Sequence, residues 1–71
     1  MAIDPVIYMQ VEMSNLYMSR FSLTLDEFIA LDEANGLLEF IEEGYGPFHL
    51  MGDQGILDEI HDYVQSARDA D

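Results

Sequence analysis

Two histidines and the carboxylates beside them are the side chains in this sequence best suited to chemistry. His61 stands between Asp58 and Asp62, and histidine and aspartate side chains are ligands for Zn²⁺. Asp58 and His61 are three positions apart, so they can share one face of a helix. A protein metal site uses three or more such ligands, and three are not apparent here. We therefore expect His61 to be a surface histidine.

The second histidine lies in the segment 44–52, whose glycines and proline argue against a continuous helix. Pro47 and Gly52 flank His49 in this segment. A histidine in such a place can hydrogen-bond the loop backbone or contact a partner from the surface. We expect the backbone role, with partner contact as the alternative, because no nucleophile or second base near His49 supports catalysis.

The densest cluster of acids consists of Glu39, Glu42 and Glu43, with Asp32 and Glu33 just before them. A pair of carboxylates carries out acid–base catalysis where its surroundings push the two pKa values apart, and nothing in the sequence indicates a cleft of that kind. Blocks of charge are more often solvated or partner-facing surfaces. We therefore expect this cluster to lie on a helix surface, facing solvent or a partner.

The charge balance narrows the range of partners. The chain of 71 residues has fifteen acids, two arginines and no lysine, which gives a net charge of −13. Phosphate contacts need Lys and Arg, so we expect no direct binding to nucleic acid and none to anionic membrane surfaces. The charge favours a basic protein as partner. With 49% hydrophobic residues, the chain is too apolar for a disordered acidic tail.

Three further features bound the class of protein. The sequence contains no cysteine, which excludes disulfides and thiolate metal sites. Its apolar runs are too short to span a membrane, and its N-terminus lacks the basic region of a signal peptide. We expect a single acidic helical domain over residues 1–71, cytoplasmic and without a cofactor. Because so short a chain buries a modest core, we also expect support from a partner chain.

Capping residues and glycine stops predict the elements that position these side chains. Asp4 and Pro5 suit a helix start, Thr24 and Glu27 fit a capping box, and Gly36 suits the left-handed residue that ends a helix. We expect an all-α fold, a compact bundle of four helices with an irregular segment at 44–52 and a frayed tail from residue 68. The helices are expected at about 5–20, 24–35, 37–43 and 53–67.

The first helix is apolar most of the way round, and only Glu12, Asn15 and Ser19 make a polar strip. Such a helix is central in its domain or faces another chain; we expect the central position, with an added interface as the alternative. Its two adjacent apolar faces are Val6, Met9, Met13, Leu16 and Tyr17, and Ile7, Val11 and Met18. On the other helices we expect inward positions at Leu25, Phe28, Ile29, Leu31, Leu38, Ile41, Ile56, Leu57, Ile60, Tyr63, Val64 and Ala67.

Two stretches of the sequence resemble a small bacterial family of unknown function. Residues 48–52, Phe-His-Leu-Met-Gly, resemble that family's apolar-His-x-x-Gly box, and residues 58–64 are similar to its acidic Asp-Ile-x-x-Tyr helix. The resemblance covers residues 6–64. Further upstream positions fall in register without gaps, namely Thr24, Phe28, Leu31, Gly36, Leu37, Leu38, Phe40 and Ile41.

The resemblance implies a compact all-α domain with no assigned catalytic residues. Genes of that family often stand beside a gene resembling ADP-ribosyltransferases, an arrangement that suits an antitoxin, immunity or accessory protein. The chain departs from its relatives on the second helix, where they tend to carry lysines and it has Asp26, Asp32 and Glu33.

We therefore expect a noncatalytic protein-interaction module, antitoxin-like, or an immunity or accessory protein for a basic partner enzyme such as an ADP-ribosyltransferase-like protein. One alternative is an acidic DNA mimic, and another is a homodimer formed through the first helix, with no basic partner. A small metal-binding protein or enzyme is least favoured. The residues expected to bind the partner are Glu39, Glu42, Glu43, His49, Asp58 and Asp62.

Overall fold

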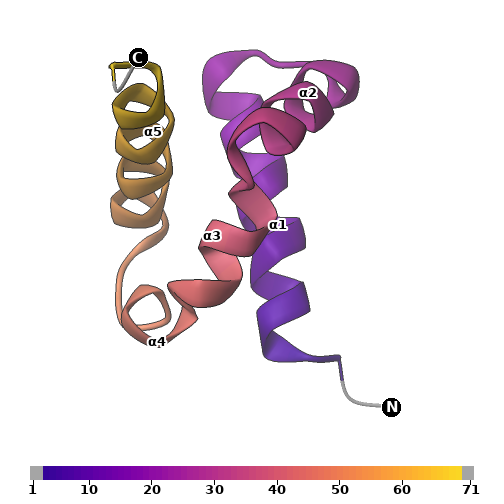
Figure 1. The fold of residues 1–71 in the computed structure, drawn as a ribbon. Helices are drawn as coiled ribbons and strands as arrows, with labels where there is room; N and C mark the ends of the chain where they lie inside the picture. The colour runs from indigo at the N-terminus through magenta and orange to yellow at the C-terminus, as the bar shows by residue number, and fades with distance from the viewer. Residues whose placement is uncertain (1–2, 70–71) are drawn as a thin grey trace.

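The computed structural model describes residues 3–69, and every regular element in that range is an α-helix. The all-α fold is thus confirmed, and the four longer helices begin and end within two residues of the predicted positions. The described chain measures 41 × 24 × 19 Å along its principal axes. In chain order the helices are α1 (Pro5–Phe21), α2 (Leu25–Asn35), α3 (Leu37–Glu43), α4 (Tyr45–Phe48) and α5 (Asp53–Asp69) (Figure 1).

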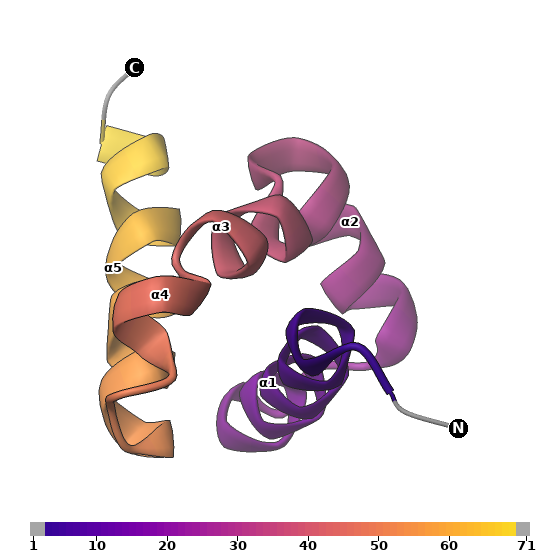
Figure 2. The ribbon, with the colours of Figure 1, turned by 90° about the horizontal axis from the view of Figure 1, so that it is seen from below.

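Helices α1 and α3 form the centre of the domain. Helix α1 packs against α2, α3 and α5, and α3 also contacts α2, α4 and α5. Seen from below, α2 and α5 lie on opposite sides of α1 and α3 (Figure 2). Each of the two outer helices therefore covers one side of the central pair, and the expected central position of the first helix is confirmed.

Local capping interactions fix the helix boundaries. Asp4 Oδ1 accepts a hydrogen bond from the Val6 amide at 2.8 Å, with Pro5 in the first helical position. Thr24 and Glu27 make both hydrogen bonds of a capping box, at 2.8 and 3.1 Å. These bonds satisfy amides that the first turn of a helix leaves without intrahelical partners, and they confirm the predicted helix starts.

Gly36 connects α2 to α3 with a φ of +69°, a left-handed conformation that is unstrained in glycine. Asp32 Oδ1 accepts a hydrogen bond from the Leu38 amide at 2.9 Å. One member of the predicted acidic cluster is thus a structural group, because it satisfies an amide in the first turn of α3.

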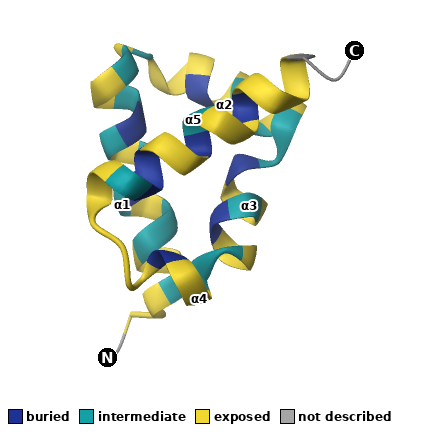
Figure 3. Cartoon of the chain, turned by 90° about the vertical axis from the view of Figure 1, so that its left-hand side faces the viewer, coloured by how far each residue is buried: buried dark blue, intermediate teal, exposed yellow. Residues whose placement is uncertain are grey.

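The core consists of buried apolar side chains that come from all five helices, and the buried stretches are dark blue in Figure 3. No charged side chain in the part of the chain whose burial is described is fully buried. Four of the six α5 positions that were expected to face inward are buried. The buried core side chains are Met13, Tyr17, Phe28, Leu37, Ile41, Phe48, Ile56, Leu57, Ile60 and Val64.

Three leucine and isoleucine side chains that were expected inside are exposed. Leu25 is 62% exposed, Ile29 44% and Leu38 36%. In α2 the residue that points into the core is Phe28. Leu25 and Ile29 therefore lie to one side of it and remain exposed. In α3 the inward positions are Leu37 and Ile41, four residues apart, so Leu38 is turned away by about 100°. The expectation was wrong because α5, the remaining long helix, lies on the other side of the central pair.

Two positions of α5 also differ from the expectation. Tyr63 is 36% exposed, and its hydroxyl donates a hydrogen bond to the Asn35 carbonyl at 2.9 Å while its ring stacks on Phe40. A tyrosine at the edge of a core can bury its ring and keep its hydroxyl at the surface. Ala67 is exposed. The helix continues to residue 69 instead of fraying at 68, and residues 70 and 71 lie outside the described part.

The segment 44–52 is less irregular than expected, because its first half forms the single-turn helix α4. The Phe48 amide donates to the Gly44 carbonyl at 2.9 Å. Pro47 is the third residue of this helix. The N–H groups of the first four helical residues have no intrahelical acceptor, so a proline at this position costs no hydrogen bond. Turns follow over residues 49–51.

The close packing of Gly44 against the Phe48 ring can be tested by substitution. A Cβ atom on Gly44 would lie 2.5 Å from Phe48 Cε2, whereas a Cβ on Gly46 meets nothing within 4 Å. We expect Gly44→Ala to lower the free energy of unfolding by about 1–3 kcal/mol, since the buried Phe48 ring must move. Gly46→Ala, the control in the same helix, should cost less, about 1 kcal/mol at most, because crowding between its new Cβ and the following Pro47 moves no buried ring. Thermal unfolding of both variants decides this, and similar melting temperatures would contradict the packing.

The orientation of α5 has its own test. Ile60 is 1% exposed and Asp62 is exposed. Ile60→Asp would bury a carboxylate without a partner and lose apolar packing, and a domain of this length has only roughly 4–10 kcal/mol of stability. We expect Ile60→Asp to be unfolded and Asp62→Ala to be nearly neutral. Urea titration followed by circular dichroism checks both, and equal midpoints would refute the assigned faces.

Candidate functional site

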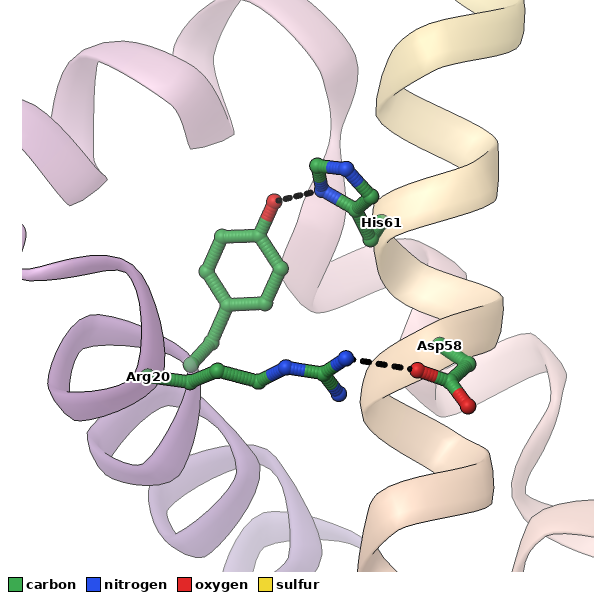
Figure 4. Close-up of polar contacts among 4 residues, drawn as sticks. Arg20, Asp58 and His61 are labelled. Atoms are coloured by element: carbon green, nitrogen blue, oxygen red, sulfur yellow. Dashed lines mark hydrogen bonds and ion pairs between the residues drawn. The ribbon is translucent and has the colours of Figure 1, made fainter.

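A small polar network joins the end of α1 to the middle of α5 (Figure 4). The Tyr17 hydroxyl lies 3.4 Å from Nδ1 of His61, and Arg20 Nη2 pairs with Asp58 Oδ1 at 2.9 Å. The His61 ring stacks on Phe21 with centroids 4.6 Å apart. His61 is therefore partly buried, not the free surface side chain that was expected, because it packs against the last turn of α1.

This network has the geometry of a structural contact. Over residues 3–69, no group of three or more His, Asp or Glu side chains is placed to hold a metal ion. The Tyr17 hydroxyl can donate to Nδ1 when neutral His61 carries its proton on Nε2. Burial raises the pKa of Tyr17 above its ordinary value, and the charge of Arg20 offsets part of that rise.

His49 has the backbone role that its surroundings predicted. Its Nδ1 lies 3.0 Å from the Tyr45 carbonyl oxygen, and because a carbonyl only accepts, Nδ1 carries the proton in this contact. The two rings stack with centroids 5.1 Å apart. The hydrogen bond and the stacking hold the exposed imidazole against α4 and leave Nε2 free.

The carboxylates expected to bind a partner lie on two helices and do not form one site. Glu39, Glu42 and Glu43 are exposed on α3, whereas Asp58 and Asp62 are exposed on α5. Asp58 is already paired with Arg20, although its side chain remains 61% exposed. None of these five carboxylates lines the cavity that contains His49.

An open groove of about 310 Å³ lies where α1, α2 and the start of α3 meet. We call it the α1–α2 groove. Its apolar side chains include Leu25, Ile29 and Leu38, which were expected in the core, together with Val11, which is 57% exposed. Its full lining is Gln10, Val11, Ser14, Asn15, Met18, Leu25, Phe28, Ile29, Asp32 and Leu38.

The sequence contained a signal for one wall of this groove. Val11 and Met18 belong to the second apolar face expected on the first helix, and an added interface was the alternative to a central position for that helix as a whole. The other wall was missed, because Leu25 and Ile29 were placed in the core. A hydrogen bond from the Gln10 side chain to the Leu38 carbonyl, at 2.8 Å, ties α1 to α3 beside it.

A second hollow, of about 440 Å³, lies between the first turns of α1, the α4 segment and the start of α5. We call it the α4 cavity. Hydrogen bonding to Glu12, the charge of Glu12 and, to a smaller extent, desolvation and the charge of Asp53 raise the pKa of Tyr8 at its edge. Its lining is Ile3, Pro5, Tyr8, Met9, Glu12, Met13, Tyr45, Phe48, His49, Met51, Asp53 and Ile56.

The raised pKa of Tyr17 leads to a test at alkaline pH. In the folded chain Tyr17 stays neutral above pH 10, whereas in the unfolded chain it ionises near its ordinary pKa of about 10. Its contribution to stability is therefore complete below about pH 10 and is lost as the pH rises through the folded pKa. The chain has no lysine or cysteine to titrate in the same range.

We expect the urea midpoint to fall between pH 9.5 and about 11, and to fall less steeply in Tyr17→Phe. The raised pKa of Tyr8 acts in the same direction, so part of the decline should remain in the variant. An identical slope in wild type and Tyr17→Phe would show that Tyr17 is solvated in the folded state.

Comparison with known proteins identifies no relative for this arrangement. No family model matches the chain, and neither a curated protein nor a solved structure matches it. None of the helices in residues 3–69 is long and apolar enough to cross a membrane. The geometry of the α1–α2 groove and the α4 cavity therefore carries the functional argument.

Proposed function

We propose that this chain is a noncatalytic protein-interaction module that binds a basic partner protein through the α1–α2 groove. The observation that supports this most directly is the exposure of Val11, Leu25, Ile29 and Leu38 around one groove. Clustered apolar side chains on a small protein are typical of interaction surfaces, whereas single ones are not.

Covering this groove would be energetically worthwhile. Burying a fully exposed leucine, isoleucine or valine contributes about 1.5–3 kcal/mol. The four side chains are each about one-third to two-thirds exposed, so a partner that covered all of them would gain roughly 4 kcal/mol before the cost of association. Such a gain fits a groove that contributes the apolar centre of an interface.

Acids flank this apolar surface. Asp32 lines the groove itself, and helical spacing places Asp26 and Glu33 beside the stripe formed by Leu25 and Ile29. On α3, Glu42 follows Leu38 by four residues and so shares its face. An apolar centre with a negative rim favours a partner with apolar anchors among lysines and arginines, because rim charges accelerate encounter with a partner of opposite sign.

The proposal extends to the class of partner. The resemblance of residues 48–64 to the family described above supports an antitoxin-like, immunity or accessory role in the cytoplasm, beside an ADP-ribosyltransferase-like enzyme. Glu39, Glu42 and Glu43 follow the groove residue Leu38 on α3 within five positions. Asp58 and Asp62 lie on α5, which is on the other side of the central helices from α2, so we propose a smaller role for them.

A homodimer is the second candidate, because Ile7 is 53% exposed and Val11 57% exposed along α1. These side chains lie four residues apart and extend the groove surface along one helix face. In a homodimer the groove would be occupied by a second copy. Sedimentation equilibrium from 1 to 100 μM separates the two candidates, since only a homodimer gains mass without a partner.

Two single substitutions with the same change in charge test the groove. Ile29 lines the groove and is 44% exposed, whereas Leu50 is 80% exposed outside it. We expect Ile29→Glu to weaken partner binding at least 10-fold, which is about 1.4 kcal/mol, and Leu50→Glu to change it less than about twofold. The measurement is surface plasmon resonance against the basic partner recovered with the wild-type chain from its source cells.

The salt dependence of the same kinetics tests the electrostatic part. We expect the association rate to fall from 50 to 500 mM salt, while the dissociation rate changes less. Neutralising Glu39, Glu42 and Glu43 together should lower mainly the association rate. Equal losses of partner affinity in Ile29→Glu and Leu50→Glu would refute binding through the groove. If only the carboxylate substitutions weakened binding, the result would indicate a DNA mimic.

A further inference from the structure

We propose that the α4 cavity receives an arginine side chain of the basic partner, with the guanidinium between Glu12 and Asp53. This inference rests on the proposed function for the identity of the partner, but it concerns a separate site.

The two carboxylates supply the charge. Glu12 comes from α1 and Asp53 from the first turn of α5, and both line the α4 cavity. Among the described residues the one side-chain ion pair is Arg20–Asp58, so neither carboxylate has a cation of its own chain beside it. Tyr8 lines the cavity together with them, and the charges of both carboxylates contribute to the raised pKa of its hydroxyl.

The remaining lining suits the rest of an arginine side chain. Met9, Met13 and Ile56 give the cavity apolar walls, against which the methylene stem of an arginine can pack while its charged end meets the carboxylates. The volume of about 440 Å³ and the open form leave room for a side chain that enters from another protein.

Aromatic rings favour arginine over lysine. Tyr8 and the stacked pair of Tyr45 and His49 line the cavity. A guanidinium is planar and weakly hydrated, stacks on aromatic faces, and donates two parallel hydrogen bonds to a carboxylate. An ammonium group is a compact, strongly hydrated charge and makes less use of such a lining.

The chain already contains one arginine held by the same combination of groups. The Arg20 guanidinium carbon lies 5.3 Å from the centre of the Phe21 ring, and its Nη2 pairs with Asp58 at 2.9 Å. There the aromatic ring, the carboxylate and the arginine all come from one chain. In the α4 cavity the ring and the carboxylates are present, and the arginine is the part that a partner would supply.

The first arm of the test uses small probes on the isolated protein. The ¹⁵N-labelled chain is titrated with N-acetyl-arginine amide and, as a neutral match of similar shape, with N-acetyl-citrulline amide. We expect saturable shifts of the amides of Tyr8, Glu12, His49 and Asp53 with the arginine probe, and at least 5-fold weaker binding of the citrulline probe. Equal binding of the two probes would overturn the inference.

Charge-neutralising variants provide the second readout. Glu12→Gln and Asp53→Asn should each weaken the arginine probe about 5-fold or more. The matched control Glu59→Gln removes the same charge at an exposed α5 position outside the cavity, and should change binding less than twofold. Equal losses in all three variants would show a diffuse attraction to net charge and would overturn the site.

The third arm assigns the arginine to the partner. Glu12→Gln should weaken the partner complex at least 5-fold, independently of the Ile29→Glu effect at the groove. Saturable arginine binding together with an unchanged partner affinity in Glu12→Gln would assign the cavity to a free guanidinium compound and overturn the partner assignment. In that event a loss with Ile29→Glu would leave the proposed function intact.

Discussion

In the packing of α5 against α1 and α3, α5 contributes more fully buried side chains to the core than any other helix. Ile56, Leu57, Ile60 and Val64 are each 3% exposed or less and supply the α5 side of this contact. Apolar burial has to outweigh the mutual repulsion in a chain with a net charge of −13. The charged groups accordingly stay outside the core, and the contact between Arg20 and Asp58 at its edge links α1 to α5.

The one-sided position of α5 determines where the functional surface lies. Helix α5 covers one side of the central pair, and the short helix α2 covers the other with Phe28 as its one fully buried residue. Leu25 and Ile29 therefore remain at the surface although their residue types suit a core. The α1–α2 groove is thus a consequence of packing five helices, two of them seven residues or shorter, around one small core.

The sequence predicted the parts of the fold that depend on local interactions. The Asp4 cap, the Thr24–Glu27 capping box and the left-handed Gly36 require only neighbouring residues, and the long apolar arc of α5 has one clear orientation. The rotation of α2 and α3 was not predictable in this way. Each is short and has apolar residues on more than one face, so tertiary contacts select Phe28 and Leu37 over Ile29 and Leu38.

The same distinction applies to the candidate sites. The backbone hydrogen bond of His49 involves Tyr45, four residues away, and its surroundings predicted it. The α4 cavity combines Tyr8, Glu12 and Asp53 from distant parts of the chain, and no local pattern of residues indicates such a combination.

The groove and the cavity are neighbours across α1. Val11 lines the groove and Glu12 lines the cavity, while Tyr8, Val11 and Glu12 together border a shallow depression between them. A partner segment that crosses α1 at this point would therefore meet an apolar surface on one side and a pair of carboxylates on the other. Apolar contacts and arginine pairing make different demands on a partner, so this arrangement favours one that presents both at the spacing set by a single helix.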